Sequence, residues 1–98
     1  MVVKPTYSIP QVKALILNGK VVVTRVAQES ALADFDFGEK EIIETVLALT
    51  VRNFYKTMDS EKKTGLMQDV YHRQIGDKMA YIKLQISEGV VIISFKKK

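Results

Sequence analysis

Apolar residues recur at helical spacing near the start of the chain. The segment SIPQ (residues 8–11) has the spacing of a capping box, in which Ser8 caps a helix and a Gln follows three positions later. Val12, Leu15 and Ile16 then lie on one helical face, and Gly19 is expected to end the helix. The pattern therefore predicts a first amphipathic helix before residue 20.

Two further helical segments and a short strand are predicted before residue 50. The β-branched run KVVVTR (residues 20–25) indicates a short strand, and residues 27–34 can form one or two helical turns. DFGE (residues 36–39) has the spacing of a second capping box. It precedes the clearest helix, in which apolar residues between 42 and 49 form a single stripe.

After Thr50 the pattern changes to strands, which are predicted over 53–60, 66–72, 77–87 and 90–96. The connections between them are short, which favours antiparallel neighbours and a four-stranded meander. Helices that precede a meander indicate an α+β fold, with the helices packed on one face of a mainly antiparallel sheet. With 98 residues the chain is expected to form a single domain.

The loop lengths predict which residues lie opposite one another in the sheet. A two-residue turn in the last hairpin places Tyr81 opposite Lys96. A four-residue loop in the middle hairpin and a three-residue loop in the first then place Gln68 opposite Tyr81 and Lys56 opposite Gln68. The sequence therefore predicts one polar row on the face away from the core, formed by Lys56, Gln68, Tyr81 and Lys96.

Charge and composition narrow the functional classes. Residues 50–98 carry 10 basic and 5 acidic side chains, whereas residues 1–49 carry 5 and 6. This asymmetry favours a polyanion as ligand, although a solvated surface would give the same pattern. With no Cys and one His, we expect no metal site and no cofactor. No apolar run is long enough to span a bilayer and no signal-peptide pattern is visible, so we expect a cytoplasmic protein without membrane contact.

The predicted row has the chemistry to bind and cleave RNA. Lys56 and Lys96 could neutralise phosphate, and Gln68 could donate a hydrogen bond to a phosphate oxygen. Tyr81 supplies a hydroxyl whose pKa the neighbouring lysines should lower. Such groups can support attack of a 2′-hydroxyl on the adjacent phosphorus without a metal, which restricts the reaction to RNA. Each residue is also typical of an ordinary strand surface, so both readings stay open at this point.

Several segments, in order and with matching spacing, resemble the MqsR family of bacterial toxins. They are FYKTM (54–58), MQDVY (67–71), YIKLQI (81–86) and VIISFKKK (91–98), with SIPQVKALILNGKVVVTR and DFDFGEKEIIETVLAL before them. The resemblance implies a RelE-like α+β fold and the toxin of a type II toxin–antitoxin pair. It implies an mRNA interferase, an endoribonuclease that cuts messenger RNA at short GC-containing sites such as GCU and so inhibits translation.

The resemblance also implies partners and site residues. The partner is expected to be an MqsA-type antitoxin with a zinc-binding part and a helix-turn-helix part, so that contact with DNA is only indirect. Functional residues of the family correspond to Lys56, Gln68 and Tyr81. We expect Lys56 and His72 to bind phosphate, Gln68 to orient it, and Tyr81 to transfer a proton or position the 2′-hydroxyl. The further RNA contacts expected around them are His72, Lys96, Tyr55, Met58 and Arg73.

The sequence departs from the family pattern at two positions near the expected site. Met67 stands where the family often has Trp, and His72 stands where Arg is typical. A His binds phosphate best when protonated, so activity is expected to fall with rising pH. Two alternatives remain: a non-catalytic RNA- or partner-binding module, and ribosome-dependent mRNA cleavage of the RelE type. A DNA-binding regulator is less favoured, because the predicted helices lie in the half with a net charge of −1, from 5 basic and 6 acidic residues.

Overall fold

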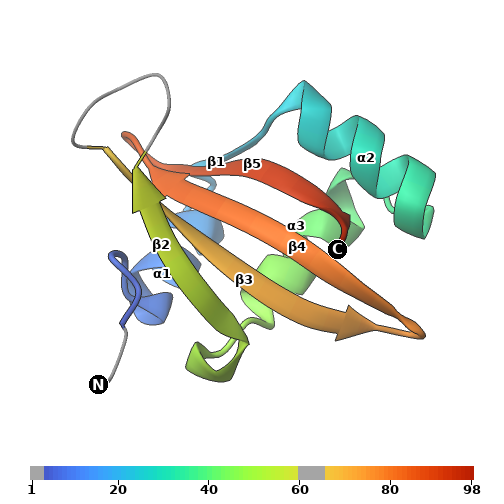
Figure 1. The fold of residues 1–98 in the computed structure, drawn as a ribbon. Coiled ribbons are helices and arrows are strands. Elements are labelled where there is room, and N and C mark those ends of the chain that lie inside the picture. The colour runs from blue at the N-terminus through green and yellow to red at the C-terminus, as the bar shows by residue number, and fades with distance from the viewer. Residues whose placement is uncertain (1–3, 60–65) are drawn as a thin grey trace.

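The computed structural model describes residues 4–59 and 66–98, which form three helices and a five-stranded sheet (Figure 1). The helices are α1 (Ile9–Leu17), α2 (Arg25–Phe35) and α3 (Glu39–Leu47), with a short 3₁₀ turn, η1 (Val51–Asn53). The strands are β1 (Val21–Val23), β2 (Phe54–Asp59), β3 (Met67–Ile75), β4 (Lys78–Ile86) and β5 (Val90–Lys97). The helices share one hydrophobic core with a single face of the sheet. The predicted α+β class is thereby confirmed.

The helix boundaries confirm one predicted cap and correct the other. The Ser8 hydroxyl accepts a hydrogen bond from the Gln11 N–H at 3.2 Å, so Ser8 caps α1 as predicted. The predicted box at 36–39 is wrong. Helix α2 is longer than the expected one or two turns, and Asp36 ends it in the left-handed conformation. Gly38 therefore caps α3, and the carboxylate of Glu41 accepts from the Gly38 N–H at 2.7 Å.

The strands follow the order β1-β5-β4-β3-β2. Strands β2 to β5 form the predicted antiparallel meander, while β1 joins the outer edge parallel to β5. Val21 lies opposite Val90 and Val23 opposite Ile92. Just after β1, the Thr24 hydroxyl donates to the Ile93 carbonyl at 3.0 Å and accepts from the Ala27 N–H at 3.1 Å. One side chain thus joins the end of β1 to β5 and also caps α2.

The register between β3 and β4 differs from the prediction by four residues. Strand β3 continues to Ile75, which lies opposite Lys78, so a two-residue turn replaces the predicted four-residue loop. The turn begins at Gly76, whose φ of +60° suits glycine. As a result His72, and not Gln68, lies opposite Tyr81.

The register between β2 and β3 differs by two residues. Lys56 lies opposite Val70 instead of Gln68, and a bulge interrupts the pairing between Phe54 and Lys56. The three-residue loop predicted for this hairpin lies outside the described residues. Both register differences are even, so Lys56, Gln68 and Tyr81 stay on one face as predicted, although the predicted row is wrong.

The last hairpin departs from the predicted register at two places, and the two shifts cancel each other. Ile86 lies opposite Val90, so the turn has three residues instead of two, and Glu88 adopts a φ of 64° within it. A bulge in β5 then shifts the register by one residue between Lys83 and Leu84. Tyr81 consequently lies opposite Lys96, as the sequence predicted.

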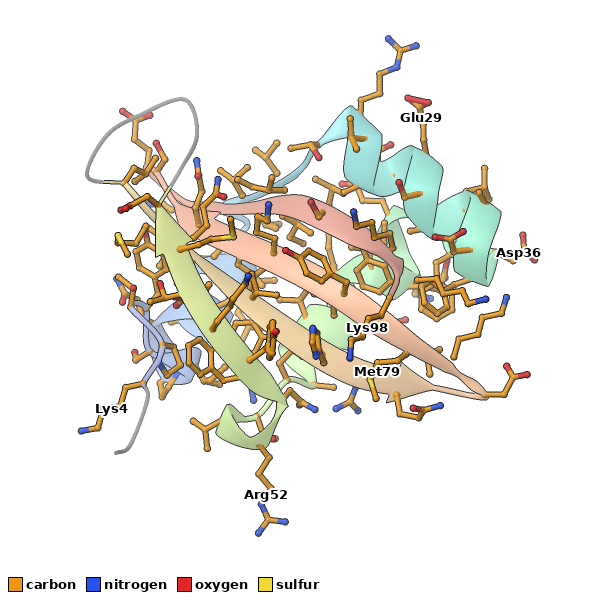
Figure 2. All side chains as sticks on the ribbon, viewed as in Figure 1. Lys4, Glu29, Asp36, Arg52, Met79 and Lys98 are labelled. Carbon is orange, nitrogen blue, oxygen red and sulfur yellow. The ribbon has the colours of Figure 1, made fainter. Side chains whose placement is uncertain are left out.

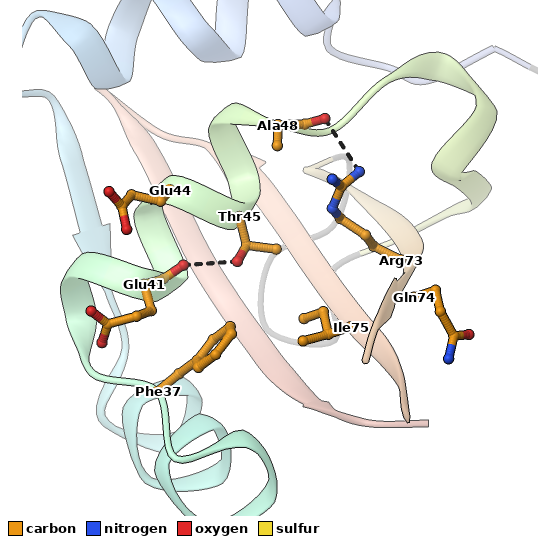
Figure 3. A pocket seen from close by; sticks show the side chains of 8 residues that line it. All are labelled: Phe37, Glu41, Glu44, Thr45, Ala48, Arg73, Gln74 and Ile75. Atoms are coloured by element: carbon orange, nitrogen blue, oxygen red, sulfur yellow. Dashed lines mark hydrogen bonds between the residues drawn. The ribbon is translucent and has the colours of Figure 1, made fainter. Parts of the chain in front are cut away.

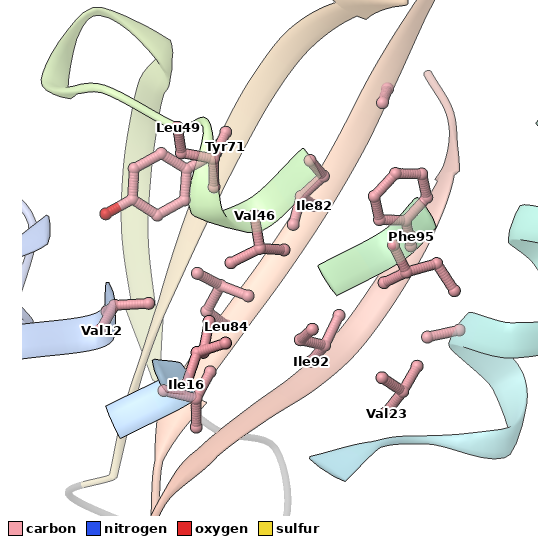
Figure 4. Packing of buried hydrophobic residues seen from close by; sticks show 14 of the residues in the cluster. Val12, Ile16, Val23, Val46, Leu49, Tyr71, Ile82, Leu84, Ile92 and Phe95 are labelled. Carbon is pink, nitrogen blue, oxygen red and sulfur yellow. The ribbon is translucent and has the colours of Figure 1, made fainter. Parts of the chain in front are cut away.

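The core lies between the helices and one face of the sheet (Figure 4). Val12 and Ile16 of α1 and Val46 of α3 pack against residues of β4 and β5 such as Leu84 and Ile92. These side chains are almost completely buried, and burial of this size is worth about 1.5–3 kcal/mol for each large aliphatic residue. The helices therefore cover one face of the sheet with a continuous apolar core.

A buried carboxylate attaches the segment before α1 to the middle of the sheet. Asp69 of β3 is 1% exposed and accepts hydrogen bonds from the backbone N–H groups of Thr6 at 3.0 Å and Tyr7 at 2.9 Å. The Tyr7 hydroxyl donates to the Met67 carbonyl at 2.8 Å. Sequence reasoning did not single out Asp69, although a charged residue inside an apolar strand is a signal of such a partner.

Candidate functional site

The face of the sheet opposite the helices, called the open face below, gathers most of the candidate residues. Figure 2 looks onto this face, with Met79 and Lys98 labelled near one end of the strands. Strand alternation and the pairing register place the following residues on it: Tyr55, Lys56, Met58, Gln68, Val70, His72, Met79, Tyr81, Lys83, Gln85, Ser94 and Lys96. None of these residues is acidic, so the part of the face that the structure describes is neutral or basic.

The centre of the open face is a row of three aromatic rings and one lysine. The rings of Tyr55 and His72 are stacked, with centroids 4.3 Å apart and planes inclined by 22°. The ring centroids of His72 and Tyr81 are 5.9 Å apart. The Nζ of Lys96 lies 5.3 Å from the centre of the Tyr81 ring. The row therefore runs across four strands, from β2 to β5.

Two further lysines flank this row. The Nζ of Lys56 lies 5.6 Å from the centre of the Tyr55 ring, and that of Lys83 lies 5.9 Å from the centre of the Tyr81 ring. Cations held near aromatic rings keep their charge available to an anion while the rings limit their motion. Alternating rings and ammonium groups suit a single-stranded nucleic acid, whose bases stack and whose phosphates are negative.

Gln68 lies two rows from the aromatic residues on the same face, four positions before His72 on β3, and the row of Lys56, Val70 and Lys83 lies between them. It is 7% exposed, and its Nε2 donates to the Oε1 of Gln85 at 3.0 Å. Met58 lies opposite Gln68 on β2. Sequence reasoning missed Gln85, because the predicted register placed Tyr81 opposite Gln68.

The pKa of Tyr81 moves in the direction opposite to the expectation. Burial of the hydroxyl, followed by the charge that Tyr55 carries when ionised, raises the pKa of Tyr81 above its ordinary value. The expected lowering by neighbouring lysines is therefore wrong, because desolvation outweighs their attraction. Tyr81 stays protonated at neutral pH and can donate a hydrogen bond, which fits an acid better than a base.

His72 has a lowered pKa and an unsatisfied nitrogen. Burial, followed by the charges of Lys98 and Lys56, lowers the pKa of its imidazole below the ordinary value. Its Nε2 is buried and has no hydrogen-bond partner within the described residues. The sequence placed His72 beside a turn at the end of a strand, whereas it lies within β3 with a ring on either side.

Arg73 does not belong to the open face. Its side chain points to the helix side of the sheet, where its Nη1 lies 3.4 Å from the Ala48 carbonyl and 3.5 Å from the Oδ1 of Asn53. Figure 3 shows this guanidinium beside the end of α3, in a shallow pocket of about 350 Å³ that Glu41 and Glu44 also line. Arg73 directly follows His72 on β3, and because successive side chains of a strand point to opposite faces, the two lie on opposite faces of the sheet.

Two general properties complete the description of residues 4–59 and 66–98. No helix in these ranges is long and apolar enough to cross a membrane. The same ranges contain no group of three or more His, Cys, Asp or Glu side chains that could hold a metal ion.

The fold and the site together define a basic α+β protein with a candidate polyanion-binding face on one side of its sheet. The family model described as "Motility quorum-sensing regulator, toxin of MqsA" matches residues 4–97. The mRNA interferase toxin MqsR of Escherichia coli (strain K12) is 32% identical over 97 residues, which cover 96% of this chain and 95% of that relative. The chain belongs to the MqsR toxin family.

Proposed function

We propose that this protein is an mRNA interferase, a toxin that cleaves messenger RNA without a metal ion and so inhibits translation. The observation that carries the proposal is the open face, where three rings and three lysines lie together without an acidic residue. Its similarity to a relative named as an mRNA interferase supports the same activity.

The reaction assigned to this face is attack of a 2′-hydroxyl on the adjacent phosphorus. A bond forms between the 2′-oxygen and phosphorus while the bond to the 5′-oxygen breaks. The 2′-hydroxyl releases its proton to solvent, and the 5′-oxygen gains a proton as it leaves. Lys56 and Lys96 are assigned to the negative charge that grows on the phosphate oxygens. Tyr81, kept protonated by burial, is assigned as the hydrogen-bond donor to the phosphate or the leaving oxygen.

Gln68 is assigned to orienting the phosphate from the row beyond Lys56 and Lys83. Its amide is fixed by Gln85, so its position is set before RNA arrives. Tyr55 and Met58 offer a ring and a flexible apolar side chain to the bases on either side of the cut.

The substrate and partner follow from the family. We propose short GC-containing sites such as GCU in cytoplasmic messenger RNA as the substrate. The partner proposed is an MqsA-type antitoxin, since the family description names MqsA. In this proposal the antitoxin carries the zinc-binding and helix-turn-helix parts, and contact with DNA occurs only through it.

The decisive experiment is cleavage of a GCU-containing RNA by purified protein in the presence of EDTA. We expect cleavage by the native protein and a loss of at least about 100-fold for Tyr81→Phe and for Lys56→Ala. Lys40→Ala removes the same charge from an exposed position of α3 and should leave cleavage unchanged. Circular dichroism should show that all variants are folded.

Each other outcome points to a different function. RNA that is bound but stays intact indicates a non-catalytic binding module. Cleavage that requires added ribosomes indicates a RelE-type mechanism. Cleavage that EDTA abolishes contradicts metal independence, and full cleavage by both variants contradicts the assigned residues.

A further inference from the structure

His72 is the single histidine of the chain, and it lies at the centre of the open face. Its ring is held between those of Tyr55 and Tyr81, and its buried Nε2 has no hydrogen-bond partner within the described residues. Buried polar atoms in folded proteins almost always have a partner, because the loss of water is otherwise uncompensated. His72 therefore has an unused hydrogen-bonding atom in the middle of a basic face, beside lysines that could hold a phosphate.

The groups that face His72 disfavour a second proton on its ring. These groups are Tyr55 and Lys56 of β2, Tyr81 and Lys83 of β4, Lys96 of β5, and Lys98, which follows β5. All are neutral or positively charged near pH 7. The limited access of water, followed by the charges of Lys98 and Lys56, lowers the pKa of the imidazole and so favours its neutral form in the free protein.

We propose that binding of an RNA phosphate to the open face protonates His72, so that RNA affinity is coupled to proton uptake. This inference rests on the function proposed above, because it requires RNA on this face. The phosphate brings negative charge beside Lys56 and Lys98 and offers an oxygen that can accept a hydrogen bond from the ring. The proton comes from solvent, and no covalent bond of the RNA changes in this step.

The coupling has a defined pH dependence. RNA binding raises the pKa of His72 from its value in the free protein to a higher value in the complex. At a pH below the pKa of His72 in the free protein, His72 is protonated in both the free protein and the complex, and RNA affinity is highest. At a pH above its pKa in the complex, His72 is neutral in both, and RNA affinity is lowest. Between the two values affinity falls by up to about ten-fold per pH unit, and up to about one proton is taken up per RNA bound.

The test uses a short GCU-containing RNA with 2′-O-methyl groups throughout, which binds but cannot be cleaved. Calorimetry in two buffers with different ionisation enthalpies measures the protons taken up on binding. The NMR signal of the imidazole, which belongs to one residue only, gives the pKa of His72 before and after RNA is added. We expect proton uptake near pH 6.5 and a higher pKa in the complex.

Two variants identify His72 as the group responsible. His72→Gln cannot accept the proton, so its affinity should be low and nearly independent of pH between 5.5 and 7.5. His72→Arg carries a permanent charge, so its affinity should be high over the same range. The native protein should bind about as tightly as His72→Arg at pH 5.5 and as weakly as His72→Gln at pH 7.5.

The outcomes separate this inference from the proposed function. RNA binding without proton uptake, with an unchanged His72 pKa, overturns the inference and leaves the proposed function standing. Equal proton uptake by His72→Gln also overturns it, because another group must then titrate. If the native protein binds no RNA at any pH, the proposed function fails, and this inference fails with it.

Discussion

Tyr55 and His72 stack ring on ring across strands β2 and β3, with centroids 4.3 Å apart. A bulge in β2 between Phe54 and Lys56 makes this contact possible. Because Tyr55 remains 55% exposed, its ring is fixed on one side and open to solvent elsewhere. A fixed and exposed ring is a suitable platform for a nucleobase.

Replacing Tyr55 with Ala should weaken binding of the uncleavable RNA by about 5- to 150-fold, since stacking of one base contributes about 1–3 kcal/mol. Tyr55→Phe keeps the ring and should bind within about two-fold of the native protein. Fluorescence anisotropy with labelled RNA measures both. Native affinity in Tyr55→Ala would show that no base stacks at this position.

Gln85 should affect catalysis through the position of Gln68. Gln85→Leu removes the oxygen that accepts from the Gln68 amide, so we expect kcat to fall about ten-fold with little change in KM. Gln85→Glu keeps an acceptor but places a negative charge on the open face, so we expect KM to rise, most strongly at low salt. Steady-state kinetics at two salt concentrations distinguish the effects. Equal changes in both variants would contradict this division of roles.

The lowered pKa of His72 should make the free protein less stable in mild acid. The unfolded chain takes up a proton on His72 near pH 6.5, while the folded protein does so only at lower pH. The unfolded state thus binds more protons in this window, and the free energy of unfolding falls as the pH drops below about 6.5. Urea denaturation at pH 7.5 and pH 5.0 should show a steeper loss for the native protein than for His72→Gln. An equal loss in the free energy of unfolding between pH 7.5 and pH 5.0 for the two proteins would mean that folding leaves the His72 pKa unchanged.

Removing the Asp69 carboxylate should destabilise the protein. Asp69→Ala loses two charge-assisted hydrogen bonds to backbone N–H groups, which predicts a loss of about 2–4 kcal/mol in the free energy of unfolding. Asp59→Ala, an exposed position on β2, serves as the matched control and should change it by less than about 0.5 kcal/mol. Urea denaturation measures both, and equal midpoints would contradict the anchoring role.

The last turn offers a pair of substitutions with opposite effects. A Cβ at Gly89 would lie 2.9 Å from the Lys20 carbonyl oxygen, a backbone atom, so Gly89→Ala should cost about 1–3 kcal/mol. Glu88 has a φ of 64°, and Glu88→Gly should remove up to about 1 kcal/mol of strain. Thermal unfolding should therefore shift down for the first and up for the second. A shift in the same direction for both would contradict this account of the turn.

Much of the composition of the open face could be predicted from the sequence, but its rows could not, and the bulge in β2 moves Phe54 from the predicted open face to the core. Strand alternation alone decides which face a side chain occupies, so Lys56, Gln68 and Tyr81 share one face in both the prediction and the structure. Rows depend on turn length and bulges, which local patterns define poorly. Because β3 extends through Ile75, His72 lies opposite Tyr81. His72 therefore takes the position at the centre of the open face that the sequence predicted for Gln68.

Electrostatic details depend on burial, which the sequence does not supply. Lysines close to Tyr81 suggested a lowered pKa, whereas desolvation raises it. The role of Asp69 depends on backbone N–H groups more than 60 residues earlier in the chain, so local patterns near residue 69 could not identify its partners.

The parallel pairing of β1 with β5 has a consequence for synthesis of the protein. Residues 21–23 pair with residues 90–92, so this edge of the sheet closes only after residues 90–92 have left the ribosome. Lys96, on the same strand as those last partners, reaches Tyr81 at the same late stage. A nascent chain therefore lacks a finished open face until residues 90–97 are available to pair.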